Sequence, residues 1–106
     1  MINNNAAIVA NKRITIGSRC RIGDGVAIFD SDFHQIDPSQ RNEGDGLVIP
    51  VTIGNNVWIG SRAMILKGVE IGENSVIGAM SVVVKSVPPN TVNAGVPCRV
   101  IRSITL

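Results

Sequence analysis

A period of six residues runs through the middle of the chain and constrains its fold more than any other feature. Between residues 53 and 88 a large aliphatic side chain recurs at every sixth position, and a second inward candidate follows each one four residues later. The large positions are Ile53, Ile59, Ile65, Ile71, Ile77 and Val83, and the second positions are Val57, Ala63, Val69, Ser75, Ser81 and Val87. An amphipathic helix repeats about every 3.6 residues and a half-buried strand about every two. The period therefore fits neither element and indicates an internal repeat.

A short flat strand and one corner per repeat satisfy this period, with the large and the second side chain of each unit pointing inward. Glycines directly follow four of the large residues, where a missing Cβ lets the backbone turn or approach a neighbour. Self-similarity of this kind marks a solenoid and predicts an all-β, single-stranded parallel β-helix of about four coils, three repeats to a coil. A sandwich with chance spacing is the alternative, and the unbroken run of repeats argues against it. The repeat does not determine the handedness of the coil, although parallel crossovers are normally right-handed.

The pattern resumes in the N-terminal third of the chain. The large positions there are Ile16, Ile22 and Ile28, and the second positions are Ile8, Ile14, Cys20 and Val26. We therefore interpret residues 1–106 as a single repeat domain. A solenoid of 106 residues leaves much of its surface exposed as a monomer, so we expect it to use a partner surface.

Simple features of the sequence indicate the cellular compartment and the state of the cysteines. The sequence has no apolar run of membrane-spanning length and no recognisable secretory signal, so we expect a cytoplasmic protein without a transmembrane segment. Its two cysteines, Cys20 and Cys98, have no metal-binding or redox spacing. Cys20 occupies a small position of the repeat, and we expect a buried free thiol there.

The charges are unevenly distributed along the chain. A formal net charge of +2 is too modest to indicate nucleic acid as a partner. After Glu73, however, there is no acidic residue, while Lys85, Arg99 and Arg102 follow. A basic C-terminal third suits an anionic ligand, and a solvated basic edge is the alternative.

One polar insert, residues 34–46 with the sequence HQIDPSQRNEGDG, interrupts the repeats. Its turn-forming and charged residues cannot lie in a β-helix wall without stranding backbone groups, so we expect a loop that protrudes from a corner. His34, the only histidine, opens this insert. Imidazole can take up and return a proton near neutral pH, which makes His34 a candidate general base. Asp30, Asp32, Asp37 or a backbone carbonyl could orient its ring.

The insert and the repeats together resemble a known group of enzymes. The segments FHQIDPSQRNEG, PVTIGNNVWIGSRAMILKGVEIGENSVIGAMSVVVKSVPPN and AGVPCRVIR occur in order. They are similar to the catalytic region of hexapeptide-repeat acetyltransferases, the group of maltose and galactoside O-acetyltransferases, and to O-acetyltransferases of polysaccharide and lipopolysaccharide synthesis. The resemblance covers about Asn4 to Ile104. It implies a left-handed parallel β-helix, a homotrimer and acetyl-CoA bound between neighbouring subunits, without a required metal.

The resemblance also implies roles for individual residues. His34 would be the general base of acetyl transfer to a hydroxyl, and the amide near Ser61 would lie beside the acetyl group. Trp58 and Ala79 would line the pantetheine arm, whereas Asn4 or Asn5, together with Asp30, would approach the acceptor. The cations implied at the phosphates of coenzyme A are Lys85, Arg99 and Arg102.

Two departures from the resembled group concern the acceptor. The maltose and galactoside enzymes carry an N-terminal helical segment that shapes the acceptor site, whereas we expect this chain to enter the repeats directly. We also expect the usual C-terminal helix to be absent or reduced to a few residues. We expect a hydroxyl of a sugar or glycan precursor to be acetylated. N-acetylation of an amino sugar and a non-catalytic assembly subunit remain the alternatives. A carbonic anhydrase on this fold needs three zinc-binding histidines, and the single histidine excludes it. An ice-ordering solenoid would show regular threonine arrays on a flat face, and this sequence has no such arrays.

Overall fold

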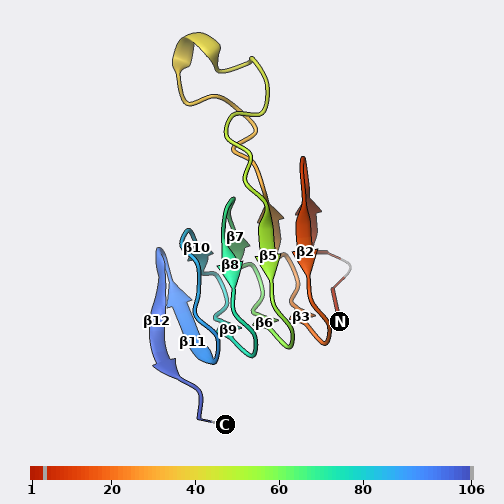
Figure 1. The fold of residues 1–106 in the computed structure, drawn as a ribbon, viewed down its shortest axis with the longest axis vertical. Coiled ribbons are helices and arrows are strands. Elements are labelled where there is room, and N and C mark those ends of the chain that lie inside the picture. The colour runs from red at the N-terminus through yellow and green to blue at the C-terminus, as the bar shows by residue number, and fades with distance from the viewer. Residues whose placement is uncertain (4, 106) are drawn as a thin grey trace.

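The computed structural model describes residues 1–3 and 5–105, which form short strands stacked into a prism with three walls (Figure 1). Wall one consists of β1 (Ala7–Val9), β4 (Ala27–Phe29), β7 (Met64–Ile65) and β10 (Val82–Val83). Wall two consists of β2 (Ile14–Ile16), β5 (Val51–Ile53) and β8 (Glu70–Ile71). Wall three consists of β3 (Arg21–Ile22), β6 (Trp58–Ile59), β9 (Val76–Ile77), β11 (Thr91–Gly95) and β12 (Cys98–Ser103). From β1 to β10, successive strands lie in walls one, two and three in turn, so the chain forms a parallel β-helix.

Parallel pairing stacks equivalent repeat positions on top of one another. Ile65 of β7, for example, pairs with Ile28 of β4 and with Val83 of β10. All large and second positions between residues 53 and 88 are buried, with exposed fractions of 0–7 %. The repeat therefore identified the core correctly, including the polar Ser75 and Ser81. Cys20 is also buried and free, as predicted.

The prediction is less accurate for the first coil. Ile8 is 37 % exposed, and Ile14 and Ile16 are only half-buried. The reason is positional, because β1 pairs only with β4 and the first coil is packed from one side. An inward side chain needs a coil on both sides to be removed from water completely.

At the other end of the prism, β12 folds back antiparallel onto β11 and becomes the edge of wall three. Beneath it lies a polar core in which Asn93 is 1 % exposed. The Asn93 side-chain amide donates to Thr91 Oγ1 at 2.9 Å, and Thr91 Oγ1 donates to the Pro88 carbonyl at 2.8 Å. The hydrophobic ladder thus ends in a hydrogen-bonded layer.

The corner between walls two and three carries a ladder of asparagines. Asn56, Asn74 and Asn90 all have positive φ, a conformation that asparagine tolerates better than most residues. Asn56 Nδ2 donates to Asn74 Oδ1 at 3.0 Å, and Asn74 Nδ2 donates to Asn90 Oδ1 at 2.7 Å. These bonds join the corners of three successive coils.

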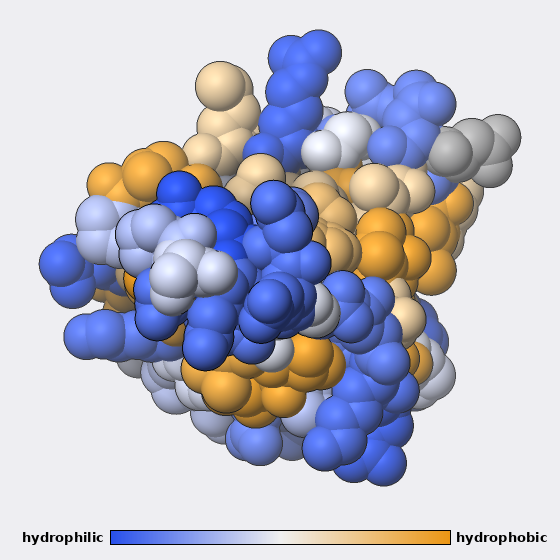
Figure 2. Space-filling model, turned by 90° about the horizontal axis from the view of Figure 1, so that it is seen from above, coloured by the Kyte–Doolittle hydropathy of each residue, from blue (hydrophilic) through white to orange (hydrophobic). Residues whose placement is uncertain are grey.

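The polar insert leaves the corner between walls one and two as an arm that extends the molecule to 50 Å in its longest dimension (Figure 1). Near its tip it contains one 3-10 turn, η1 (Pro38–Gln40). Figure 2 looks down on the arm and shows a mainly hydrophilic surface, with hydrophobic surface of the prism on either side of it. In the part of the chain that the structure describes, no helix has the length and apolar character needed to cross a membrane.

The outer faces of the walls differ in character. On wall one, the outward-facing residues that pair in register are all apolar: Ala7, Ala27, Met64 and Val82. On wall two the equivalent row is polar, with Thr15, Thr52 and Glu70. On wall three it is mixed: Arg21, Trp58, Val76, Val92 and Arg102.

Candidate functional site

The base of the arm is clamped by backbone hydrogen bonds. Ser31 and Val48 form an antiparallel bridge, and the Asp32 N–H donates to the Leu47 carbonyl at 3.1 Å. Gly46 packs against the carbonyl of His34 so closely that an added Cβ would lie 2.1 Å from that oxygen, and its φ is +69°. Only glycine fits there without displacing His34.

The arm itself is ordered by its own hydrogen bonds. Asp37 caps η1 by accepting from the Ser39 N–H at 3.0 Å and from the Ser39 hydroxyl at 2.8 Å, and these bonds lower the pKa of the Asp37 carboxyl. Pro38 occupies the first turn, where a missing N–H costs nothing. Arg41 ends the turn, and its guanidinium donates to the Ile36 carbonyl at 3.0 Å.

His34 is exposed at the start of the arm, and its ring is held by a backbone carbonyl. Nδ1 lies 2.9 Å from the Arg41 carbonyl oxygen. A carbonyl can only accept, so Nδ1 carries a proton in this arrangement, and in the neutral ring Nε2 has its lone pair free. Nε2 can therefore accept a proton from a ligand.

The three aspartates near His34 are occupied by other partners. Asp32 pairs with Lys67 Nζ at 2.8 Å, which ties the base of the arm to the corner of the next coil. Asp37 caps η1, as described above. Of the orienting groups weighed from the sequence, the backbone carbonyl is the one that contacts the ring.

Asp30 lies fully buried beneath the arm. Its carboxylate accepts three backbone N–H bonds of 2.8 Å each, from Asn11, Lys12 and Arg13 in the preceding coil. Burial acts to raise the pKa of Asp30, but the three amides outweigh it and hold the pKa below its ordinary value. The side chain fastens one coil to the next and presents no free oxygen to a ligand.

Phe33, next to His34, has a φ of +65°, which is unusual for a bulky residue. Its ring packs edge-to-face on Phe29, with ring centroids 5.2 Å apart. The strained backbone turns the chain out of the wall, and the aromatic contact holds it there. His34 therefore starts from a fixed base.

A second group of candidate residues lies at the corner between walls three and one. Trp58 is on the outer face of β6 and is 56 % exposed. Ser61 and Ala79 occupy equivalent corner positions of adjacent coils, and the Met80 N–H donates to the Ser61 carbonyl at 2.9 Å. An added Cβ at Gly60 would lie 2.6 Å from Ala79 N, so this glycine allows the close stacking. Ser61 and Ala79 thus form an exposed strip at this corner, one strand end away from Trp58.

The three candidate cations lie at the last coil. Arg99 and Arg102 project from β12, where they pair with Ala94 and Val92 of β11, and both are exposed. Lys85 follows β10 and is also exposed. Among the described residues none of the three forms a salt bridge. Their charge is therefore available to an anion.

A single copy of the chain does not bring all candidate residues together. His34 and Lys85 belong to the corner that carries the arm, between walls one and two. Ser61 and Ala79 belong to the opposite edge of wall one, and Trp58, Arg99 and Arg102 lie on wall three. Asn5 lies at that opposite edge too, where its Nδ2 donates to Asp24 Oδ1 at 2.6 Å. Asn4, predicted to approach the acceptor, lies outside the described residues.

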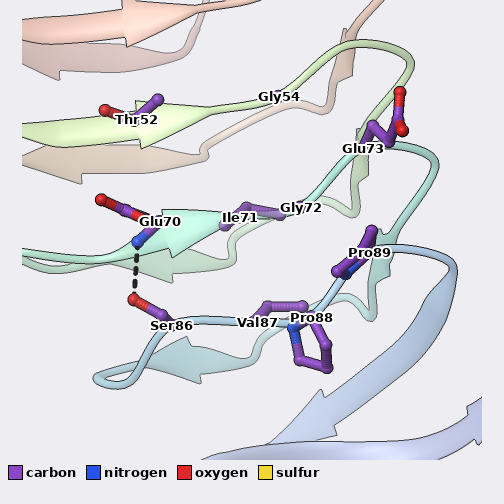
Figure 3. A pocket seen from close by; sticks show the side chains of 10 residues that line it. All are labelled: Thr52, Gly54, Glu70, Ile71, Gly72, Glu73, Ser86, Val87, Pro88 and Pro89. Carbon is purple, nitrogen blue, oxygen red and sulfur yellow. Dashed lines mark hydrogen bonds between the residues drawn. The ribbon is translucent and has the colours of Figure 1, made fainter.

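A pocket elsewhere on the prism is lined by none of these residues. It lies on wall two, where Ser86 Oγ accepts from the Glu70 N–H at 3.0 Å and Pro88 and Pro89 replace a further strand (Figure 3). Its polar lining includes Glu70 and Glu73. Two carboxylates without a cation beside them do not suit a phosphorylated ligand.

Sequence reasoning missed three residues that shape the His34 environment. Arg41 supplies the carbonyl that holds the ring, Gly46 supports the His34 backbone, and Lys67 pairs with Asp32. A glycine near the end of a polar insert was a visible signal for a tight turn. Nothing in the spacing could have identified the carbonyl of Arg41.

Comparison with known proteins gives a consistent result. Residues 50–85 match the family described as bacterial transferase hexapeptide (six repeats). Galactoside O-acetyltransferase of Escherichia coli is 50 % identical over 102 residues, which are 96 % of this chain and 50 % of that protein. The chain spans about half the length of the curated relatives it matches.

Solved structures extend the similarity to the fold. A galactoside acetyltransferase in complex with coenzyme A has a TM-score of 0.89 and 49 % identity, covering 94 % of this chain and 50 % of that chain. The polySia specific acetyltransferase NeuO has a TM-score of 0.87 and 34 % identity, covering 99 % and 50 %. The match confirms the left-handed parallel β-helix that the resemblance implies, so the general preference for right-handed crossovers does not hold for this coil.

Proposed function

We propose that this chain transfers the acetyl group of acetyl-CoA to a hydroxyl of a sugar or glycan precursor. The proposal starts from the family, because the chain belongs to the hexapeptide-repeat transferases. The observation that carries the proposal is the state of His34, whose Nδ1 is bound to a carbonyl and whose Nε2 is free. The relatives and structural neighbours support the substrate classes, since their names include a galactoside and a polysialic acid acetyltransferase.

In the proposed reaction His34 handles the proton. Nε2 removes the proton of the acceptor hydroxyl as its oxygen attacks the thioester carbonyl, and a C–O bond forms. The tetrahedral intermediate collapses with cleavage of the C–S bond, and the imidazolium returns the proton to the departing sulfur. A backbone N–H can stabilise the oxyanion in between, and the proposal assigns this role to the amide near Ser61.

The cofactor half of the site is supported by shape and charge. The closely stacked, exposed corner of Ser61 and Ala79, with the exposed Trp58 on the adjoining strand, offers a surface for the pantetheine arm. Arg99 and Arg102 extend the same side of the molecule with two cations, and guanidinium groups pair with phosphate oxygens in bidentate fashion. Lys85 contributes a third cation from the other corner.

We propose that the site is completed by a second copy in a homotrimer. Wall one has an apolar outer row, which suits burial against other copies rather than exposure to water. Its two edges are the corner that carries His34 and the corner that carries Ser61. If wall one of three copies faces a common axis, the first corner of each copy meets the second corner of the next. Rotational closure then assembles three identical sites.

The acceptor side rests on fewer contacts. Asn5 lies exposed at the corner that would face His34 of the neighbouring copy, which supports it as an acceptor contact. Asp30, by contrast, is committed to three amides, and its part in the proposal is to hold the coil beneath the arm. The free thiols of Cys20 and Cys98 agree with the cytoplasmic location that we include in the proposal.

A test compares the chain with its His34→Ala variant on a panel of hydroxyl-bearing sugars and amino sugars, with acetylated product measured by mass spectrometry. We expect product on hydroxyl acceptors, and a fall of about 10²- to 10⁴-fold in kcat for the variant with acetyl-CoA affinity nearly unchanged. Gln35→Ala, a neighbouring change in the arm, serves as the control. Acetylation by His34→Ala at the unaltered rate would contradict the mechanism. Acetyl-CoA binding without product on any acceptor would indicate an assembly subunit instead.

A further inference from the structure

The arm fixes its own histidine. Among the described residues, every hydrogen bond of segment 34–43 joins two members of that segment. Figure 1 shows why, since the ribbon carries the tip of the arm well beyond the walls of the prism. The position of the Arg41 carbonyl, and with it the proton on Nδ1 of His34, therefore depends on bonds within the arm.

Arg41 is the residue through which these bonds converge. Its carbonyl accepts from His34 Nδ1 at 2.9 Å, while its guanidinium donates to the Ile36 carbonyl at 3.0 Å. The side chain thus closes a ring between residues 36 and 41, and η1 fills that ring. The Gln40 N–H donates to the Asp37 carbonyl at 3.0 Å inside it.

We infer that the Arg41 side chain is a positioning residue that selects the Nδ1–H tautomer of His34. Without the guanidinium bond, the segment 36–41 can open and its carbonyl can rotate away from the imidazole. Which ring nitrogen carries the proton is set by the hydrogen bond that the other makes, so loss of this bond leaves a mixture of tautomers. In the Nε2–H form the nitrogen that faces the acceptor has no lone pair to offer.

The inference rests on the proposed function for its catalytic meaning, but its structural part can be tested without turnover. The chain contains one histidine, so the imidazole ¹⁵N resonances of the labelled protein belong to His34 alone. The nitrogen shifts of a neutral imidazole distinguish its two tautomers. We expect the Nδ1–H form to dominate in the unaltered protein and a mixture in Arg41→Ala.

Two further variants make the experiment specific. Gln35→Ala removes another bond from an arm side chain to a carbonyl, that of Glu43, and we expect it to keep the Nδ1–H form. Arg41→Lys retains a cationic donor for the Ile36 carbonyl, and we expect partial recovery. Recovery by lysine would show that the effect is not general disruption of the arm. With an active acceptor, kcat should fall about 5- to 20-fold in Arg41→Ala while the KM for acetyl-CoA stays unchanged.

The outcomes are separable. An unchanged tautomer in Arg41→Ala overturns the inference, whatever the activity. A shifted tautomer in Arg41→Ala, with the Nδ1–H form kept in Gln35→Ala, supports it even if no acceptor is acetylated, in which case the proposed function fails and the positioning role stands.

Discussion

At the scale of single residues, the most consequential side chain besides His34 is Asp30. It is buried, and its two oxygens accept from the amides of three successive residues in the preceding coil. Bonds to a charged acceptor are stronger than neutral ones, and a buried amide left without an acceptor is costly. Asp30 therefore stabilises the junction from which the arm departs.

We predict that Asp30→Asn lowers the free energy of unfolding by about 2–4 kcal/mol at pH 7, since one amide group then faces another donor. The pKa of Asp30 is lowered in the folded protein, so its stabilisation is present above the unfolded carboxyl pKa of about 3.9 and is lost as the pH falls further. Denaturant titrations at fixed protein concentration should thus show that the difference in unfolding free energy between the unaltered protein and Asp30→Asn becomes smaller below about pH 4. Asp45→Asn, on the exposed arm, is the matched control. If the unaltered protein and Asp30→Asn differed in free energy of unfolding by the same amount at pH 7 and at pH 3, this explanation would be refuted.

At the scale of elements, the corner between walls two and three depends on its asparagine ladder. Asn74 links two neighbours, accepting from Asn56 at 3.0 Å and donating to Asn90 at 2.7 Å, with a φ of +63°. We predict that Asn74→Ala costs about 1–2 kcal/mol, from the lost bonds and the less tolerated conformation. Thermal unfolding measures the loss, and Asn42→Ala in the arm should change the midpoint little. Equal midpoints for the two variants would show that the ladder contributes nothing.

The repeats and the arm differ in how much of them the sequence could predict. Side chains such as Ile59 and Ile77 reveal their burial because each wall repeats one environment at a fixed period. The arm has no such repetition, and the critical contact of His34 is made by the backbone of Arg41, which any residue could supply. The partners of Asp30 could not be predicted for a related reason, since the amides that it binds lie one coil away and no spacing connects them to it. Contacts that lie outside the six-residue repeat leave no pattern in the sequence, so only the structure reveals them.

At the scale of the whole molecule, the account depends on a site shared between copies. His34 lies at one edge of wall one, the Ser61 strip lies at the other, and an apolar row lies between them. The sequence suggested a partner surface, but only the order of the walls shows which face would have to be covered. Closing three copies around that face makes each site a product of two chains.

Mixed assembly tests this claim most directly. One chain carries His34→Ala and the other carries Arg99→Glu with Arg102→Glu. The acetyl-CoA concentration is kept low enough that the variant with the two reversed charges shows no activity, so each variant is inactive alone. Unfolded together and refolded at equal ratio, they should recover about a quarter of the unaltered rate, because random assembly pairs an intact arm with an intact cofactor side in about one interface of four. Sites formed within a single chain would leave the mixture as inactive as its two components, and that result would contradict the account.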